Sequence, residues 1–184
     1  MNYYIVKEAE TKISVKQKFK ILDKIKKFMR KDEFIEELFN EYGKSLDLID
    51  EIPIDFSSDM DVSAQTIDGS IKLNEKLAKK PFMLIARYVV HELVHVFQHM
   101  DGLEDDGKKK NYLDNKDEVE AFQRQIEFDA NNNGIDKAVT YTKKLIKFHK
   151  YPKSKRESKL EELTEGIDDV ENNTDKSRGD GERG

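Results

Sequence analysis

The sequence predicts an α+β fold that is mainly helical, with a small antiparallel sheet packed beside one long helix. Apolar residues recur at three- and four-residue steps through residues 15–42 and again after residue 117, which is typical of amphipathic helices. Between residues 52 and 73 they alternate with polar residues, as in half-buried strands. After Pro81 an apolar stretch continues to residue 101 without glycine or proline, which favours a long buried helix.

The N-terminal part is predicted to form amphipathic helices within about residues 14–50. Ser14 with Gln17 three residues later matches a capping box at the start of the first helix. Asp32 is suited to begin the second helix, and Gly43 is suited to end it. The apolar face of each helix is expected to pack into the core.

The sheet is predicted at about residues 52–73. Asp68-Gly69 is a two-residue hairpin signal between two stretches of strand character. Pro53 favours an edge position for the strand that follows it, because proline cannot donate a hydrogen bond to a neighbouring strand. The β-branched and aromatic residues 3–6 could add another short strand.

Three helices are predicted after the sheet. Pro81 begins a mostly buried helix that extends to about residue 100, since proline is favoured in the first helical turn. An exposed loop is expected at residues 101–111, which carry glycines and many charges. Helices at about 117–130 and 135–149 follow, again on the spacing of their apolar residues.

The composition changes at Tyr151, where charged and small polar residues become dominant. We therefore expect a single domain over residues 1–150 and a charged, flexible tail over residues 151–184. Four apolar residues at helical spacing could form a short helix that docks on the domain or on a protein partner, namely Leu160, Leu163, Ile167 and Val170. Alone, they bury too little surface to offset the entropy lost on ordering.

Charge and composition exclude several classes of protein. The 33 Lys and Arg residues against 38 Asp and Glu residues give a net charge of −5, so no net basic field attracts nucleic acid. The absence of cysteine excludes disulfides, thiolate metal sites and a cysteine nucleophile. No apolar run approaches the roughly 20 residues of a membrane span, and the N-terminus lacks the apolar stretch of a signal peptide. The expectation is a soluble, cytoplasmic or otherwise intracellular protein with neither a nucleic-acid nor a membrane partner.

The chemistry is concentrated in His91-Glu92-Leu93-Val94-His95. Residues four apart on a helix lie about 40° and about 6 Å from each other, so both imidazoles can approach one ion. Neutral imidazole suits Zn²⁺. Glu92 can then act as general base toward a metal-activated water. The motif predicts a zinc site with His91 and His95 as ligands and Glu92 as the catalytic residue.

This motif resembles that of the zincin metallopeptidases, and over residues 62–130 the chain is most similar to the minimal members of their gluzincin branch. In that branch the third ligand is a glutamate on a downstream helix, commonly followed three residues later by a small residue. Glu118 with Ala121 fits this pattern, whereas Glu120 would have Gln123 at that position. The resemblance therefore implies Glu118 as the third ligand, with Glu120 as the alternative.

Another zincin branch places His or Asp six residues after the second histidine, with a glycine midway and a methionine turn downstream. Asp101 has that spacing, but Gln98 stands at the glycine position and Met100 is the last methionine. The gluzincin branch is therefore preferred. Its members often carry an aspartate four residues after the ligand to orient a histidine, and Phe122 stands there instead. That difference leaves the partner of the histidines unidentified.

The resemblance implies a zinc metallopeptidase of the endopeptidase type that holds one Zn²⁺ ion per chain and cleaves a peptide or protein substrate. The strand at Ser70 to Leu73 could pair with an extended substrate. His99 lies too far from His91 to share its ion, and we expect it at the rim. An oxyanion stabiliser is expected among Tyr112, Tyr141 and His149. The alternative is a zinc-binding regulatory or partner-binding protein of zincin fold with little or no peptidase activity.

Overall fold

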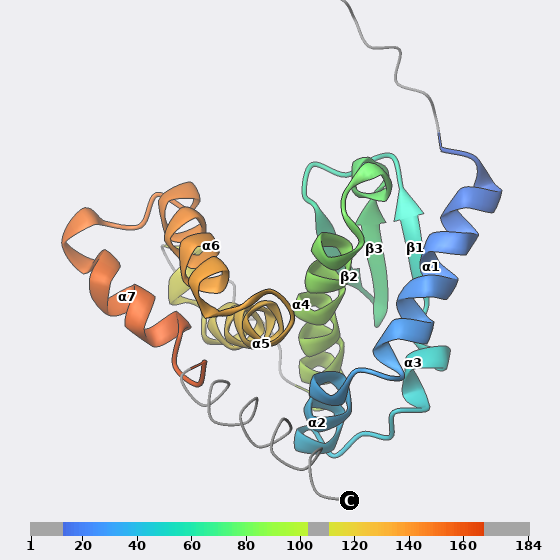
Figure 1. Ribbon diagram of the computed structural model, residues 1–184, viewed down its shortest axis with the longest axis horizontal. Helices are drawn as coiled ribbons and strands as arrows, with labels where there is room; N and C mark the ends of the chain where they lie inside the picture. The colour runs from blue at the N-terminus through green and yellow to red at the C-terminus, as the bar shows by residue number, and fades with distance from the viewer. Residues whose placement is uncertain (1–12, 103–110, 168–184) are drawn as a thin grey trace, which may run out of the picture.

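The computed structural model describes residues 13–102 and 111–167 (Figure 1). The expected strand at residues 3–6 and most of the expected loop after Asp101 lie outside these ranges. The fold is α+β and mainly helical, as predicted. Its helices are α1 (Val15–Met29), α2 (Glu33–Glu41), α3 (Leu48–Glu51), α4 (Phe82–Met100), α5 (Lys116–Asn133), α6 (Ile135–Phe148) and α7 (Arg156–Leu163). Its strands are β1 (Ile54–Ser57), β2 (Ala64–Ile67) and β3 (Ser70–Asn74). Short 3₁₀ turns are η1 (Glu75–Lys79), η2 (Tyr112–Asp114) and η3 (Lys153–Lys155).

The local signals at the helix ends behave as predicted. The Ser14 side chain accepts from the backbone N–H of Gln17, and the Gln17 side chain completes the capping box of α1. The Asp32 carboxylate accepts from the backbone N–H of Ile35 and caps α2. Gly43 follows α2 with a φ of 62°, a conformation that glycine adopts without a steric penalty.

The three strands form a mixed sheet rather than the antiparallel sheet expected from the sequence. The strand order is β1-β3-β2, with β1 parallel and β2 antiparallel to β3. The hairpin at Asp68-Gly69, where φ is 49° and 71°, folds β3 back between the other two strands. Because β3 then runs in the direction of β1, these two strands pair in parallel. Pro53 does precede an edge strand, as predicted.

This topology also corrects the expected substrate-binding edge. The strand at Ser70 to Leu73 is the central strand, with both of its edges already hydrogen-bonded. The free edge on this side of the sheet belongs to β2. Proximity in sequence to α4 favours β3 as the free edge, whereas the path of the chain after β1 places β2 outermost.

Helix α4 lies at the centre of the molecule. In Figure 1 it stands between the sheet on one side and α5 to α7 on the other. It is buried almost continuously from Ile85 to Gln98, as the apolar sequence predicts. One hydrophobic cluster joins α4 to the sheet and to α1 and α2, and a second joins α5, α6 and α7. In the described ranges, no helix is both long enough and apolar enough to cross a membrane.

The expected tail boundary at residue 151 is wrong. Tyr151, Leu163 and Ile167 are buried in the second hydrophobic cluster, so the folded unit extends at least to residue 167. Lys159 is also buried and donates to the backbone carbonyl of Leu113 over 2.8 Å. These few apolar residues are enough to order α7 because they complete a core that α5 and α6 already form. The surface that they bury on those two helices adds to their own, and the sequence estimate did not include it. Residues 168–184 lie outside the described part of the chain.

Candidate metal centre

Helix α4 brings the two predicted histidine ligands together. The Nε2 atoms of His91 and His95 lie 3.2 Å apart, and their rings are nearly perpendicular. Both rings are directed toward α5. Phe122 of α5 stands at the position where members of the resembled family often carry an aspartate. Its ring packs on that of His91, with the ring centroids 4.5 Å apart. An apolar contact therefore replaces a polar one on this side of His91.

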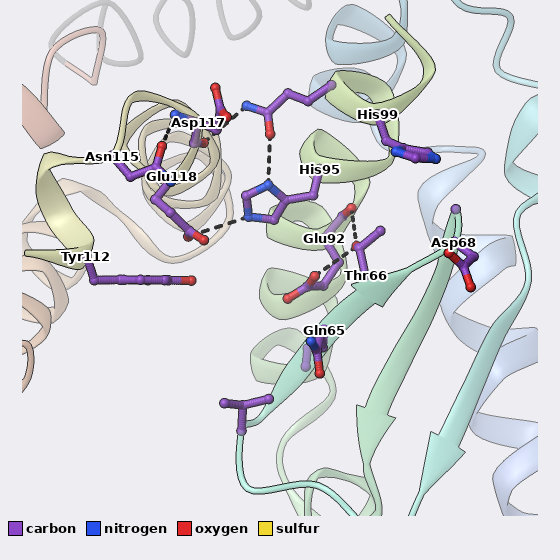
Figure 2. Close-up of a pocket in the computed structure, with 14 residues that line it drawn as sticks. Gln65, Thr66, Asp68, Glu92, His95, His99, Tyr112, Asn115, Asp117 and Glu118 are labelled. Carbon is purple, nitrogen blue, oxygen red and sulfur yellow. Dashed lines mark hydrogen bonds and ion pairs between the residues drawn. The ribbon is translucent and has the colours of Figure 1, made fainter. Parts of the chain in front are cut away.

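The third group of the cluster is Glu118, in the first turn of α5. Its Oε2 atom lies 3.4 Å from Nε2 of His91. The same atom lies 3.5 Å from Nε2 of His95, a contact drawn in Figure 2. The Asn115 side chain caps α5 by accepting from the backbone N–H of Asp117. A carboxylate in the first turn is also favoured by the helix dipole. The end of α5 that faces α4 is therefore suited to carry an anionic ligand.

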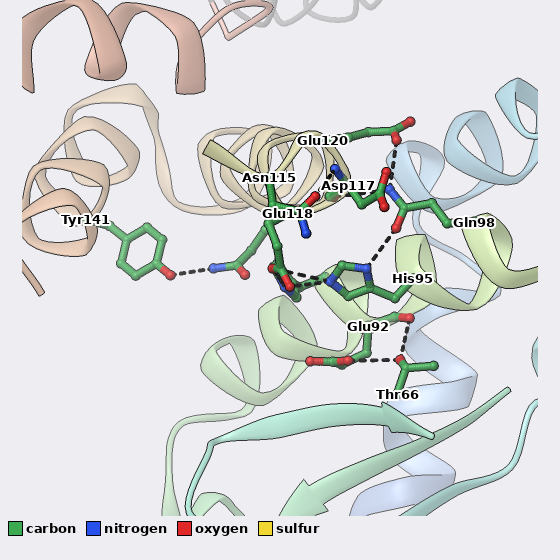
Figure 3. Close-up of polar contacts among 11 residues, drawn as sticks. Thr66, Glu92, His95, Gln98, Asn115, Asp117, Glu118, Glu120 and Tyr141 are labelled. Carbon is green, nitrogen blue, oxygen red and sulfur yellow. Dashed lines mark hydrogen bonds and ion pairs between the residues drawn. The ribbon is translucent and has the colours of Figure 1, made fainter. Parts of the chain in front are cut away.

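The alternative ligands lie elsewhere. The Glu120 carboxylate accepts a hydrogen bond from the Gln98 side-chain amide (Figure 3). It also accepts one from the hydroxyl of Tyr42, which follows α2. Asp101 forms an ion pair with Lys44. The structure thus groups Glu118, and neither Glu120 nor Asp101, with the two histidines.

The three groups fit a metal ion on two independent observations. Their donor atoms are 3.2 to 3.5 Å apart. In a tetrahedral shell with ligand distances of about 2.0 to 2.1 Å, neighbouring donors are separated by about 3.3 Å. In addition, Oε2 of Glu118, which faces both histidine rings, is buried without a hydrogen-bond partner among the described residues. Buried polar atoms are rarely left unpaired, so this cluster could bind a metal ion.

The electrostatics of the cluster favour a positive charge. Burial raises the pKa of the Glu118 carboxyl, but the interactions with His91 and His95 outweigh burial and lower it to about 2. Burial also lowers the pKa of His95, but Glu118 and Glu92 outweigh it and raise that pKa to about 9. A proton or a metal ion at this position is therefore stabilised by the same carboxylates.

Glu92 faces a different direction from the histidines. It follows His91 by one residue, which turns it by about 100° around α4 toward the sheet. The Thr66 hydroxyl of β2 lies 2.9 Å from Oε2 of Glu92 and 3.0 Å from its backbone carbonyl, and can donate to either (Figure 2). Burial raises the pKa of Glu92, and the two histidines and Thr66 oppose that rise. Glu92 thus lies next to the cluster, but its carboxylate contacts Thr66 rather than the cluster.

A cavity of about 700 Å³ lies beside Glu92 and two members of the cluster, His95 and Glu118. It lies between β2 with its hairpin turn on one side and the start of α5 with η2 on the other. Residues that line it include Thr66, Glu92, His95, His99, Tyr112 and Glu118. His99 is exposed on its edge, in agreement with the prediction of a rim residue.

The three candidates for oxyanion stabiliser separate clearly. Tyr112 lines the cavity, and Figure 2 shows its ring extending into the cavity toward α4. His149 stacks on the ring of Tyr112, with centroids 4.9 Å apart. Tyr141 instead accepts a hydrogen bond from Gln125 and covers the guanidinium of Arg87, outside the residues that line the cavity. Tyr112 is therefore the candidate that can contact a bound molecule.

Two residues at the site were missed by sequence reasoning, namely Thr66 and Gln98. Gln98 had been considered only as a departure from a glycine. Its position one turn after His95 on a buried helix was a usable signal, because a buried amide needs partners. Thr66 had no such signal, since its contact with Glu92 depends on how the sheet packs on α4.

Comparisons with known proteins add no relative. No family model, no curated protein and no solved structure matches this chain. The function must therefore be argued from the site itself.

Proposed function

We propose that this protein is a zinc-dependent metallopeptidase in which Glu92 is the general base. The observation that carries the proposal is that His95 and Glu118, two members of the cluster of two histidines and one carboxylate, line one cavity together with the separate carboxylate of Glu92. Catalytic zinc sites use three protein ligands, and structural ones use four. The described residues offer three, namely His91, His95 and Glu118, which favours a site with one position left for water or substrate.

The donor set favours a transition metal such as Zn²⁺ over Mg²⁺ and Ca²⁺. Mg²⁺ and Ca²⁺ prefer shells made of oxygen atoms, whereas imidazole nitrogen suits Zn²⁺. An octahedral shell with bonds of about 2.1 Å would bring neighbouring donors to about 3.0 Å, closer than the 3.2 to 3.5 Å found here. The separations are nearer to those of a tetrahedral zinc shell.

The residues around the cavity suit peptide hydrolysis. Zinc held by the cluster would polarise the substrate carbonyl and lower the pKa of a water molecule toward about 7. Glu92 would accept one proton from that water while the water oxygen bonds to the carbonyl carbon. Glu92 would then deliver the proton to the amide nitrogen as the C–N bond breaks, leaving a carboxylic acid and an amine. The acid would lose its remaining proton to the amine, which gives a carboxylate and an ammonium group. The raised pKa of Glu92 helps it to hold the proton between these events.

The walls of the cavity suit an extended peptide. The outer edge of β2 has no strand beside it in the described sheet, so its backbone groups could pair with a substrate. Across the cavity, the Tyr112 hydroxyl could donate to the oxygen that becomes negative as the carbonyl is attacked. A substrate bound along β2 would thus lie between Glu92 and Tyr112.

The test combines metal analysis with one substitution. The purified protein should contain about one zinc per chain by mass spectrometry, and the zinc-loaded protein should cleave members of a broad peptide library. Glu92→Gln should keep the metal and lose cleavage, because the amide cannot accept the proton. Iron in place of zinc would contradict the proposal. Full zinc occupancy without any cleavage would support the alternative, a zinc-dependent regulatory or partner-binding protein.

A further inference from the structure

The side chain of Gln98 connects the two helices that carry the metal cluster. Gln98 lies on α4 one turn after His95, and only 3% of it is exposed. Its Oε1 atom lies 2.8 Å from Nδ1 of His95. Its Nε2 atom donates to the backbone carbonyl of Asp117 over 3.1 Å and to the carboxylate of Glu120 over 2.8 Å (Figure 3). A single amide thus contacts one histidine and the first turn of α5.

These partners determine which way the amide points. The Asp117 carbonyl and the Glu120 carboxylate can only accept hydrogen bonds, so the NH₂ group of Gln98 must face α5. The amide oxygen must therefore face His95, where it can only accept. His95 then has to donate from Nδ1, and its neutral ring carries the lone pair on Nε2. That nitrogen is the one that lies beside Nε2 of His91 and Oε2 of Glu118.

The same amide also fixes the position of α5. The residue whose carbonyl it binds, Asp117, directly precedes Glu118 in the chain. Glu120 is held from its other side by the hydroxyl of Tyr42, which follows α2. The start of α5 is therefore fastened to α4 through the Gln98 amide, and Glu120 also links it to Tyr42 after α2.

We propose that Gln98 is a positioning residue of the metal centre, which sets the tautomer of His95 and holds the Glu118 turn at ligand distance. This inference rests on the proposed metal binding, although it does not require peptidase activity. Outer partners that orient metal-bound histidines commonly contribute roughly 10- to 100-fold to metal affinity. Gln98 would fill that role in place of the aspartate looked for at Phe122.

The test is the affinity of the full-length protein for Zn²⁺, measured by competition with a chromogenic chelator. Gln98→Met removes the hydrogen bonds at similar volume and should weaken Zn²⁺ binding by roughly 10- to 100-fold. Gln125→Met is the matched control, since Gln125 is equally buried on α5 but donates to Tyr141. It should leave the affinity unchanged. The visible absorption of the Co²⁺-loaded protein should change in the first variant and not in the second.

Nitrogen NMR of the imidazoles in the zinc-loaded wild-type protein provides a measurement that needs no variant. The proposal expects a proton on Nδ1 of His95 and none on Nε2. Metal bound through Nδ1, or Gln98→Met with the wild-type affinity, would overturn the inference while leaving the metal site intact. If the wild-type protein binds no Zn²⁺, the proposed function fails and this inference falls with it.

Discussion

At the scale of single residues, the identity of the third ligand depends on the direction in which each carboxylate leaves α5. Glu118 and Glu120 are two positions apart, which separates them by about 200° around the helix. Glu118 faces His91 and His95, whereas Glu120 accepts hydrogen bonds from Tyr42 and Gln98. One carboxylate is therefore available to an ion and the other is already used to hold the helix.

Substitution of the two glutamates should separate these roles. We expect Glu118→Gln to lower Zn²⁺ affinity by more than the roughly 10- to 100-fold that loss of an outer partner costs, because a charged ligand is removed. Glu120→Gln should lower Zn²⁺ affinity by no more than roughly 10- to 100-fold. Chelator competition on both proteins measures the difference. Equal losses would mean that Glu118 is not a ligand.

Thr66 should matter for catalysis without affecting the metal. Its hydroxyl is within hydrogen-bond distance of the Glu92 carboxylate, so Thr66→Val frees that carboxylate to rotate. We expect kcat to fall by roughly 10-fold, a part of the 10²- to 10⁴-fold that a general base contributes. Zinc content should be unchanged. Thr66→Ser keeps the hydroxyl and serves as the control, and steady-state kinetics on a cleaved peptide decides between them.

At the scale of elements, the capping signals and the apolar periodicity were enough to place α1, α2, α4 and α5, because these depend on neighbours in the sequence. The sheet was harder to predict. Its strands and its hairpin followed from local alternation and from Asp68-Gly69, but the parallel pairing of β1 with β3 depends on the path of the chain between them. Helix α7 was misjudged because its stability comes from the core that it completes.

The docking of α7 has a direct consequence for stability. Leu163 is fully buried, whereas Leu160 is partly exposed. Leu163→Ala should reduce the free energy of unfolding by about 2 to 4 kcal/mol through lost burial and a residual cavity. Leu160→Ala should reduce the free energy of unfolding by clearly less than Leu163→Ala. Urea denaturation of both variants measures this, and equal small losses would indicate that α7 is not packed in solution.

At the scale of the whole molecule, the metal cluster lies between two hydrophobic cores, both of which include residues of α5. His91 and His95 belong to the helix that packs on the sheet, and Glu118 belongs to the helix that packs on α6 and α7. An ion bound only by the folded protein would stabilise both cores together, by about 2.7 kcal/mol at a free concentration of 100 times Kd. Removal of metal should therefore lower Tm.

The size of this effect should depend on pH. In the metal-free protein the raised pKa of His95 stabilises the fold fully below 6.5, and this contribution is lost as the pH rises through about 9. The lowered pKa of Glu118 stabilises the fold above pH 4.5, and this contribution to stability is lost as the pH falls through about 2. Zinc must displace the His95 proton, so its affinity rises with pH. The difference in Tm between zinc-loaded and chelator-treated protein should increase from about pH 6.5 to about pH 9. A difference that shrinks over this range would contradict His95 as a ligand.

The amino-acid sequence alone determined helices α1, α2, α4, α5 and α6, the hairpin and the pairing of His91 with His95, because each depends on residues within a few positions of one another. It also narrowed the third ligand to two glutamates. Tertiary structure decided what depends on contacts between distant segments: which glutamate meets the histidines, which strand has the free edge, and where the folded unit ends. The roles of Thr66 and Gln98 belong to the same group, since a buried polar side chain acquires its partners only when two elements pack together.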